Sequence, residues 1–212
     1  MITPPHPWSR GTYNFIELEP CDVLVCINDR KDMFSKIKRW AMGRYEHVEM
    51  YLGIEFTDIP LLVESDNRGV VIQNVAHQGG RHVRVMRPDY LTKKQTKTII
   101  RKAVEIASNS KSSYDWIGLI RFAGLRVLRN KFGIKRPITY KYKRDPKMIC
   151  SEAIAEMFWR SDINILPTYL TPIPEDFSRE SHVLCTVNEG NLVIAQEGNS
   201  VKLFLDNGGD KE

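Results

Sequence analysis

The feature of this sequence best suited to covalent chemistry is Met148-Ile-Cys-Ser-Glu152, in which a cysteine follows a basic loop. Residues 149–158 repeat apolar side chains at the helical period, so we expect a short helix over these residues, with Cys150 near its start. A helix N-terminus presents unpaired N–H groups and the positive end of the helix dipole. Both favour the thiolate, and the same groups can stabilise an oxyanion. The alternative is a small buried cysteine without a chemical role.

A nucleophilic cysteine needs a base, usually a histidine. The chain has five histidines: His6, His47, His77, His82 and His182. His47 begins the alternating segment 47–53, whose positions 47, 49, 51 and 53 share one face of an expected strand. The start of a strand is a rigid place to hold a ring, so His47 is our candidate base. The alternative for His47 is a solvated surface histidine.

The base in turn needs a partner that orients its ring. Glu64 interrupts the apolar run of the next expected strand, and burying an unpaired carboxylate is costly. Pairing of adjacent antiparallel strands would bring Glu64 within reach of His47. Ser65 points to the other face of that strand and is kept as a reserve candidate. The alternative is that Glu64 faces solvent.

These residues need a scaffold of strands and helices. Strands are expected at 22–27, 47–53, 60–65, 69–74 and 82–86, the last four as an antiparallel meander, with two weak strands within 192–205. Helices are expected at 31–42, from Thr92 (with a capping box to Gln95), at 115–129 and at 149–158. The order predicts an α+β fold, a small antiparallel sheet packed against helices.

Length and composition are those of an ordinary globular protein. The chain has 212 residues, of which 42% are hydrophobic and 27% charged. These values exclude a mainly disordered chain and a disulfide scaffold, and they fit one domain. We expect a domain over residues 18–205, with an N-terminal arm at 1–17 and a polar tail at 206–212.

The charge is segregated along the chain. Residues 92–148 carry 16 Lys and Arg against three acids, a local net charge of +13, whereas the remainder is at −8 and the whole at +5. Such a segment can contact nucleic acid, anionic lipid or an acidic polymer, or can be a solvated face. Nucleic acid is disfavoured because no motif of a known reader is present. Peripheral membrane contact and an anionic substrate stay open, and the sequence does not specify the oligomeric state.

The sequence shows no targeting signal and no metal-binding motif. No secretory signal and no membrane-spanning stretch is found, so we expect a cytoplasmic protein with free thiols at Cys21, Cys26, Cys150 and Cys185. Cys21 and Cys26 should point to opposite faces. No spacing of zinc ligands is complete, so we expect no metal and no cofactor.

Taken in order, these segments resemble one known family, the circularly permuted NlpC-type, papain-like amidases of the YiiX kind. The matching stretches are Pro20-Cys-Asp-Val-Leu, His47-Val-Glu-Met-Tyr-Leu-Gly, Val63-Glu-Ser…Gly69-Val, Tyr114-Asp-Trp…Gly118-Leu, Ile149-Cys-Ser-Glu-Ala and Leu170-Thr-Pro…Pro174-Glu-Asp-Phe. In the permuted branch the histidine strand precedes the cysteine helix, as it does here. The resemblance spans about residues 18–187.

The resemblance implies a fold, three site residues and a reaction. The fold would be a barrel-like antiparallel sheet with the cysteine at a helix N-terminus. Cys150 would be the nucleophile, His47 the base and Glu64 the third member of a thiol hydrolase. Relatives cleave cell-wall (murein) peptides, and others with the permuted order, similar to lecithin:retinol acyltransferase, move or remove lipid acyl chains. The substrate is then a peptide, murein or acyl compound.

The chain also departs from the family pattern. A glycine usually precedes the aspartate of the first turn, where this chain has Cys21. The connection 54–60 leaves the register of the His47 and Glu64 strands open, and the basic loop 131–147 is expected to border the cleft. A non-catalytic module that binds an anionic surface or nucleic acid is the alternative from another class.

Overall fold

The computed structural model describes residues 18–27, 44–53, 59–66, 68–109, 148–166, 172–181, 183–197 and 200–206. The helices expected at 31–42 and 115–129, the basic loop 131–147, the arm 1–17 and the end of the tail lie outside these residues. The described elements are antiparallel strands and a few helices, so the predicted α+β class is confirmed.

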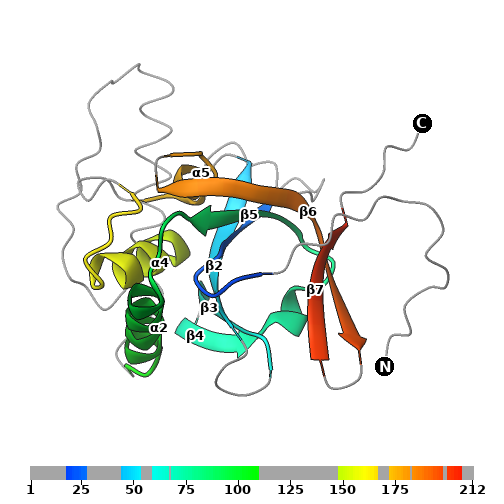
Figure 1. Ribbon diagram of the computed structural model, residues 1–212, viewed down its shortest axis with the longest axis horizontal. Helices are drawn as coiled ribbons and strands as arrows, with labels where there is room; N and C mark the ends of the chain where they lie inside the picture. Colours follow the sequence, from blue (N-terminus) through cyan, green and yellow to red (C-terminus); the bar gives the residue numbers. More distant parts are fainter. Residues whose placement is uncertain are drawn as a thin grey trace.

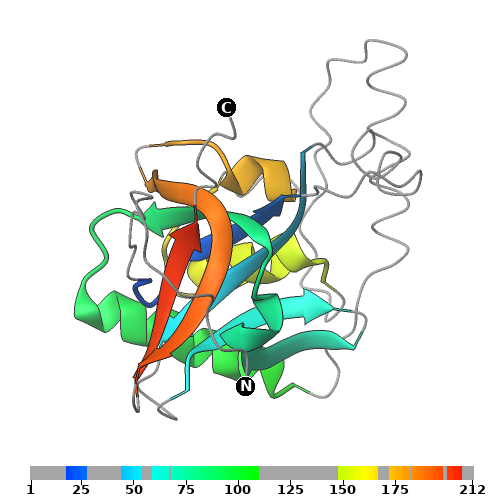
Figure 2. The same cartoon turned by 90° about the vertical axis from the view of Figure 1, so that its right-hand side faces the viewer.

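A seven-stranded antiparallel sheet forms the centre of the protein, in the order β4-β3-β2-β1-β5-β6-β7. The strands are β1 (Val23–Ile27), β2 (Tyr45–Gly53), β3 (Leu61–Asp66), β4 (Gly69–Asn74), β5 (His82–Pro88), β6 (Leu184–Glu197) and β7 (Ser200–Asp206). The sheet is strongly curved, and β6 and β7 curl around to one side of it (Figures 1 and 2). In the described residues the curled sheet stays open, because β4 and β7 end the hydrogen-bonded order.

The strand order corrects two sequence predictions. Strands β2, β3 and β4 form the expected meander, but β5 leaves β4 through the short 3₁₀ helix η1 (Val75–Gln78) and pairs with β1. The predicted weak strands within 192–205 begin earlier, because β6 starts at Leu184 and pairs with β5 along its length. The polar run 185–191 has little strand propensity of its own, so the exposed edge of β5 supplies the pairing that extends the strand.

The helices lie against one face of the sheet. Helix α2 (Lys93–Ala107) contacts β4, and helix α4 (Cys150–Trp159) contacts β2, β3 and α2 (Figure 1). The predicted cap of α2 is confirmed, since Thr92 and Gln95 form a capping box. A third, one-turn helix, α5 (Pro174–Phe177), lies near β1 and β2.

Buried residues form one cluster on each face of the sheet. The larger cluster lies between the sheet and the helices and includes Val25, Met50 and Phe158. The smaller cluster lies on the other face and includes Leu24 and Leu62. Alternation along the strands assigns each residue to a face, and this alternation decides which side chains can meet.

The turn before β1 shows how the chain accommodates its unusual cysteine. Cys21 has φ +79°, the left-handed conformation that favours glycine, and its N–H donates to the carbonyl of Tyr51 at 2.8 Å. Its side chain is buried in the helix-side cluster, whereas Cys26 belongs to the cluster on the other face, as predicted. Burial, with the charge of Asp22, raises the pKa of the Cys21 thiol to about 12. Cys21 is therefore a buried packing residue in a glycine conformation.

Candidate active site

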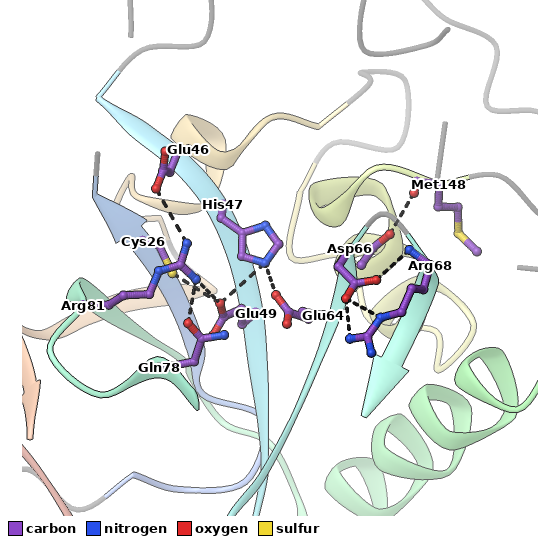
Figure 3. Close-up of polar contacts among 11 residues, drawn as sticks. Cys26, Glu46, His47, Glu49, Glu64, Asp66, Arg68, Gln78, Arg81 and Met148 are labelled. Carbon is purple, nitrogen blue, oxygen red and sulfur yellow. Dashed lines mark hydrogen bonds and ion pairs between the residues drawn. The ribbon is translucent and has the colours of Figure 1, made fainter. Parts of the chain in front are cut away.

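The candidate site lies where β2 and β3 separate. The two strands pair from Gly53 and Leu61 only as far as Met50 and Val63. Beyond this point β2 stays with β1, and β3 stays with β4 as far as Asp66. Figure 3 shows β2 and β3 diverging, with the side chains of His47 and Glu64 between them. Helix α4 contacts both strands, so its first residues can approach this fork from the helix side.

His47 and Glu64 meet across the fork. Nε2 of the His47 ring and Oε2 of Glu64 form a hydrogen-bonded ion pair, and the two side chains are only 15% and 8% exposed. The orienting contact predicted from the sequence is therefore present in the structure. A hydrogen bond to one ring nitrogen fixes the tautomer and orientation of the imidazole.

Ser65, the reserve candidate, lies on the opposite face of β3. Its hydroxyl donates to the carbonyl of Met148 at 2.9 Å and does not contact His47. This bond ties β3 to the chain two residues before Cys150. The geometry therefore favours Glu64 as the partner of His47 and gives Ser65 the role of an anchor.

Cys150 is the first residue of α4 and is buried. The N–H of Ile149 donates to the Glu152 carboxylate at 3.1 Å, and the Ser151 hydroxyl donates to the carbonyl of Pro172 at 2.7 Å. The first bond caps the helix start, and the bonds of Ser65 and Ser151 join this start to β3 and to Pro172. The first-turn amides, including that of Cys150, have no partner within the helix, as at any helix start.

The imidazole of His47 interacts with Cys150 as well as with the two acids beside it. Burial by itself would lower the pKa of His47. The charge and the hydrogen bond of Cys150, the hydrogen bond of Glu64 and the charge of Glu49 outweigh burial and hold the pKa of His47 well above its ordinary value of 6.5. The imidazolium form is thus favoured between a sulfur and a carboxylate, which is the arrangement that a thiolate–imidazolium pair requires.

Glu49 is a second carboxylate at the same ring and was not among the predicted site residues. Its Oε1 lies 3.5 Å from Nε2 of His47, accepts a hydrogen bond from Arg81 at 2.9 Å and is 3.6 Å from the Cys26 sulfur. Burial raises the pKa of Glu49, while the charges of His47 and Arg81 oppose this rise. The sequence carried a signal for Glu49, since positions 47 and 49 share one strand face.

A cation could be held by the same side chains. His47, Glu49 and Glu64 each offer one ligand atom, and these atoms lie within 4.8 Å of one another. The site already contains a cation, however, because Arg81 donates to Glu49, and His47 is hydrogen-bonded to Glu64. These contacts favour a proton-transfer network over a metal centre at this position.

The remaining histidines and cysteines that the structure describes lie elsewhere. His77 is exposed in η1, and His82 lies 3.6 Å from Glu189 at the start of β5. His6 and His182 are outside the described residues. All four cysteines are free thiols. Burial raises the pKa of Cys21, Cys26 and Cys185, so these three thiols are held in the unreactive form.

Comparison with known proteins adds no assignment. No protein-family model matches the chain, and no curated protein matches it. Among the helices that the structure describes, none combines the length and the apolar character needed to cross a membrane. The fold class is thus α+β, and any closer assignment depends on the site itself.

Proposed function

We propose that this protein is a thiol hydrolase of the permuted papain-like type, with Cys150 as nucleophile, His47 as base and Glu64 as the residue that orients His47. The observation that carries the proposal is the position of the imidazole, which interacts with the Cys150 sulfur and is hydrogen-bonded to Glu64. The order of these residues in the chain, strand histidine first and helix cysteine last, supports the permuted type.

Acylation of the cysteine follows from this geometry. The Cys150 sulfur attacks the carbonyl carbon of an amide, and the C–S bond forms as the carbonyl oxygen takes up the negative charge. Amides of the first turn of α4, including that of Cys150, are placed to stabilise this oxyanion. The His47 imidazolium then donates its proton to the leaving nitrogen as the C–N bond breaks. Glu64 keeps the ring in place through both steps.

Deacylation reverses the roles. His47, now neutral, takes a proton from a water molecule that attacks the thioester carbonyl. Collapse of the second tetrahedral intermediate breaks the C–S bond and releases a carboxylic acid. The sulfur leaves as a thiolate opposite the protonated imidazole, which restores the starting pair. No cofactor or metal is required for either half of this sequence.

The substrate class is the least constrained part of the proposal. An amide of the peptide or murein kind is our first choice, from the resemblance of the ordered motifs. An acyl-lipid or acyl-amino-acid substrate is the alternative. One observation bears on both: Lys93, Lys94, Lys97 and Arg101 of α2 line a shallow hollow on the solvent side of this helix. This basic face suits an anionic substrate or an anionic membrane surface.

Selective labelling of Cys150 tests the chemistry without knowledge of the substrate. Iodoacetamide should alkylate Cys150 at neutral pH much faster than Cys185, although Cys185 is the more exposed of the two. The His47→Ala variant should lose the fast labelling of Cys150, and Cys185→Ala serves as the control in which Cys150 is still labelled fast. Equal labelling of both thiols would favour the non-catalytic binding module.

A substrate panel then separates the two hydrolase proposals. The wild-type protein and Cys150→Ala are compared on murein peptides, acyl-lipids and acyl-amino acids, with release of a new amine or acid as the readout. Turnover of murein peptides that is lost in Cys150→Ala supports the amidase. Turnover of acyl substrates alone would replace it by the acyl hydrolase.

A further inference from the structure

We propose that Glu49, held by Arg81, is a second positioning residue for His47, and that it acts with Glu64 to keep the imidazole protonated opposite Cys150. This inference rests on the proposed thiol chemistry and extends its triad to a branched network of two carboxylates and one arginine. Neither the order of motifs nor the proposed mechanism requires Glu49.

The first support is geometric. Glu49 and Glu64 approach the same ring nitrogen of His47, one from its own strand β2 and one from β3 (Figure 3). Glu64 makes the direct hydrogen bond, and Oε1 of Glu49 lies 3.5 Å from Nε2. Because both carboxylates lie near this nitrogen, a small rotation of the protonated ring away from Glu64 would bring its N–H toward Glu49. The imidazolium therefore keeps a hydrogen-bond acceptor in either orientation.

The second support is the incomplete satisfaction of a fully buried acid. Glu49 is 0% exposed, yet its Oε2 has no hydrogen-bond partner among the described residues. An unsatisfied buried carboxylate oxygen costs about 1–3 kcal/mol or more, so this position of Glu49 is unfavourable for stability. A cost of this kind that is retained beside a reactive ring indicates a functional role.

The third support is the cation that makes two adjacent acids tolerable. Two carboxylates near one nitrogen repel each other, and one of them would otherwise take up a proton. Nη1 of Arg81 donates to Glu49 at 2.9 Å and to Gln78 at 2.6 Å. The second terminal nitrogen, Nη2, lies 3.6 Å from the Glu46 carboxylate. The charge of Arg81 thus favours the charged form of Glu49, against the burial that raises the pKa of this acid.

The charged and titratable groups that act on His47 are Glu49 on β2, Glu64 and Asp66 on β3, and Cys150 on α4. Around them lie Cys26 on β1, whose sulfur is 3.6 Å from Glu49, and Arg81 before β5, which is ion-paired with Glu49 and lies 3.6 Å from Glu46. Glu64 and Glu49 are the two acids in contact with the ring. Removing the charge of Glu49 should therefore weaken the imidazolium, whereas removing the charge of Glu46 should not.

Histidine NMR titration measures this effect directly. The signal of His47 is assigned by its loss in His47→Gln, and its titration midpoint is compared in wild-type protein, Glu49→Gln, Glu49→Asp and Glu46→Gln. We expect Glu49→Gln to lower the midpoint by about one pH unit, since a negative charge near the ring is lost. Glu49→Asp keeps the charge and should stay close to the wild type. Glu46→Gln loses the same charge on the same strand and should not change the midpoint.

The outcomes are distinguishable from those of the proposed function. The positioning role is overturned by a wild-type midpoint in Glu49→Gln, by an equal shift in Glu49→Asp, or by an equal shift in Glu46→Gln. Failure of Glu49→Gln to fold would likewise overturn it in favour of a structural role. The labelling of Cys150 in the wild type reports separately on the thiol chemistry, so the proposed function can fail while the titration still shows the Glu49 effect.

Discussion

Asp22 and Glu49 are both fully buried carboxylates that are paired with an arginine, and they differ in how completely their oxygens are hydrogen-bonded. At the turn before β1, Asp22 accepts hydrogen bonds at 2.8 Å from Nε and Nη2 of Arg87 and from the N–H of Glu19, so both of its oxygens are bonded. At the fork, Glu49 is bonded to Arg81 through one oxygen only, and the other has no partner among the described residues.

The difference teaches that burial of an acid does not identify a functional residue. Burial raises the pKa of both Asp22 and Glu49, so this property does not separate them. Their partners do. Asp22 is locked by a bidentate arginine and a backbone amide, as in a purely structural ion pair. Glu49 keeps an acceptor unused and lies against a histidine that faces a cysteine.

The largest expected effect is a loss of turnover on replacement of Cys150, which lies at the fork. Replacing Cys150 by alanine should reduce turnover by at least about 10⁴-fold, because the nucleophile is removed while binding is retained. The far-UV circular dichroism spectrum should be unchanged, since one small side chain is lost. The control is Cys185→Ala, which should keep full activity. Equal activity of the Cys150→Ala variant would exclude the proposed mechanism.

The turn before β1 should respond in the opposite way, with a loss of stability and no loss of thiol reactivity. Asp22→Asn breaks the bidentate pair and should lower the free energy of unfolding by about 3 kcal/mol, because Arg87 and the turn lose their buried partner. Urea unfolding measures this change. The rate of Cys150 alkylation in the folded variant should equal that of the wild type. A large loss of that rate would mean that the turn and the fork are not independent.

The sequence indicated the three candidate residues at the fork better than the contacts that surround them. Cys150, His47 and Glu64 were found because each belongs to a local pattern, a helix start or a strand alternation. Arg81 and the role of Glu49 were missed because they depend on β5 pairing with β1, which puts the segment before β5 one strand away from β2 and lets the Arg81 side chain reach Glu49. Local propensity gives no information on such a long-range pairing.

The early part of β6 was missed for the same physical reason. Its polar residues gain strand structure from the edge of β5 and have little preference of their own. The position of the fork was not predicted either. The length of the connection 54–60, which joins β2 to β3, left the register of these two strands undetermined. By contrast, the cap at Thr92 and the strands β3 and β4 follow from local rules and were predicted to within one residue.

The pH dependence of stability offers a finer comparison. The pKa of His47 is raised in the folded protein, so its imidazolium stabilises the fold fully below the ordinary value of 6.5. This contribution is lost as the pH rises through the higher, folded-state pKa. Cys150→Ala removes the strongest influence that raises this pKa, so the alkaline loss of stability should begin at a lower pH in that variant. Urea unfolding at a series of pH values measures the shift, and identical profiles would contradict the pairing of Cys150 with His47.

The smallest expected effect concerns the anchor of the helix start. Ser65→Ala removes the hydrogen bond to the Met148 carbonyl and should cost about 1 kcal/mol of unfolding free energy. It should also lower turnover a few-fold, because the segment before Cys150 is released from β3 and the sulfur is placed less accurately. Ser161→Ala is the matched control, since its hydroxyl makes the same kind of bond, to Met157 at 3.0 Å, beyond the other end of α4. The control should lose similar stability without a change in rate. Equal losses of rate in both variants would show that general loosening of α4, and not the anchor at the fork, controls the position of Cys150.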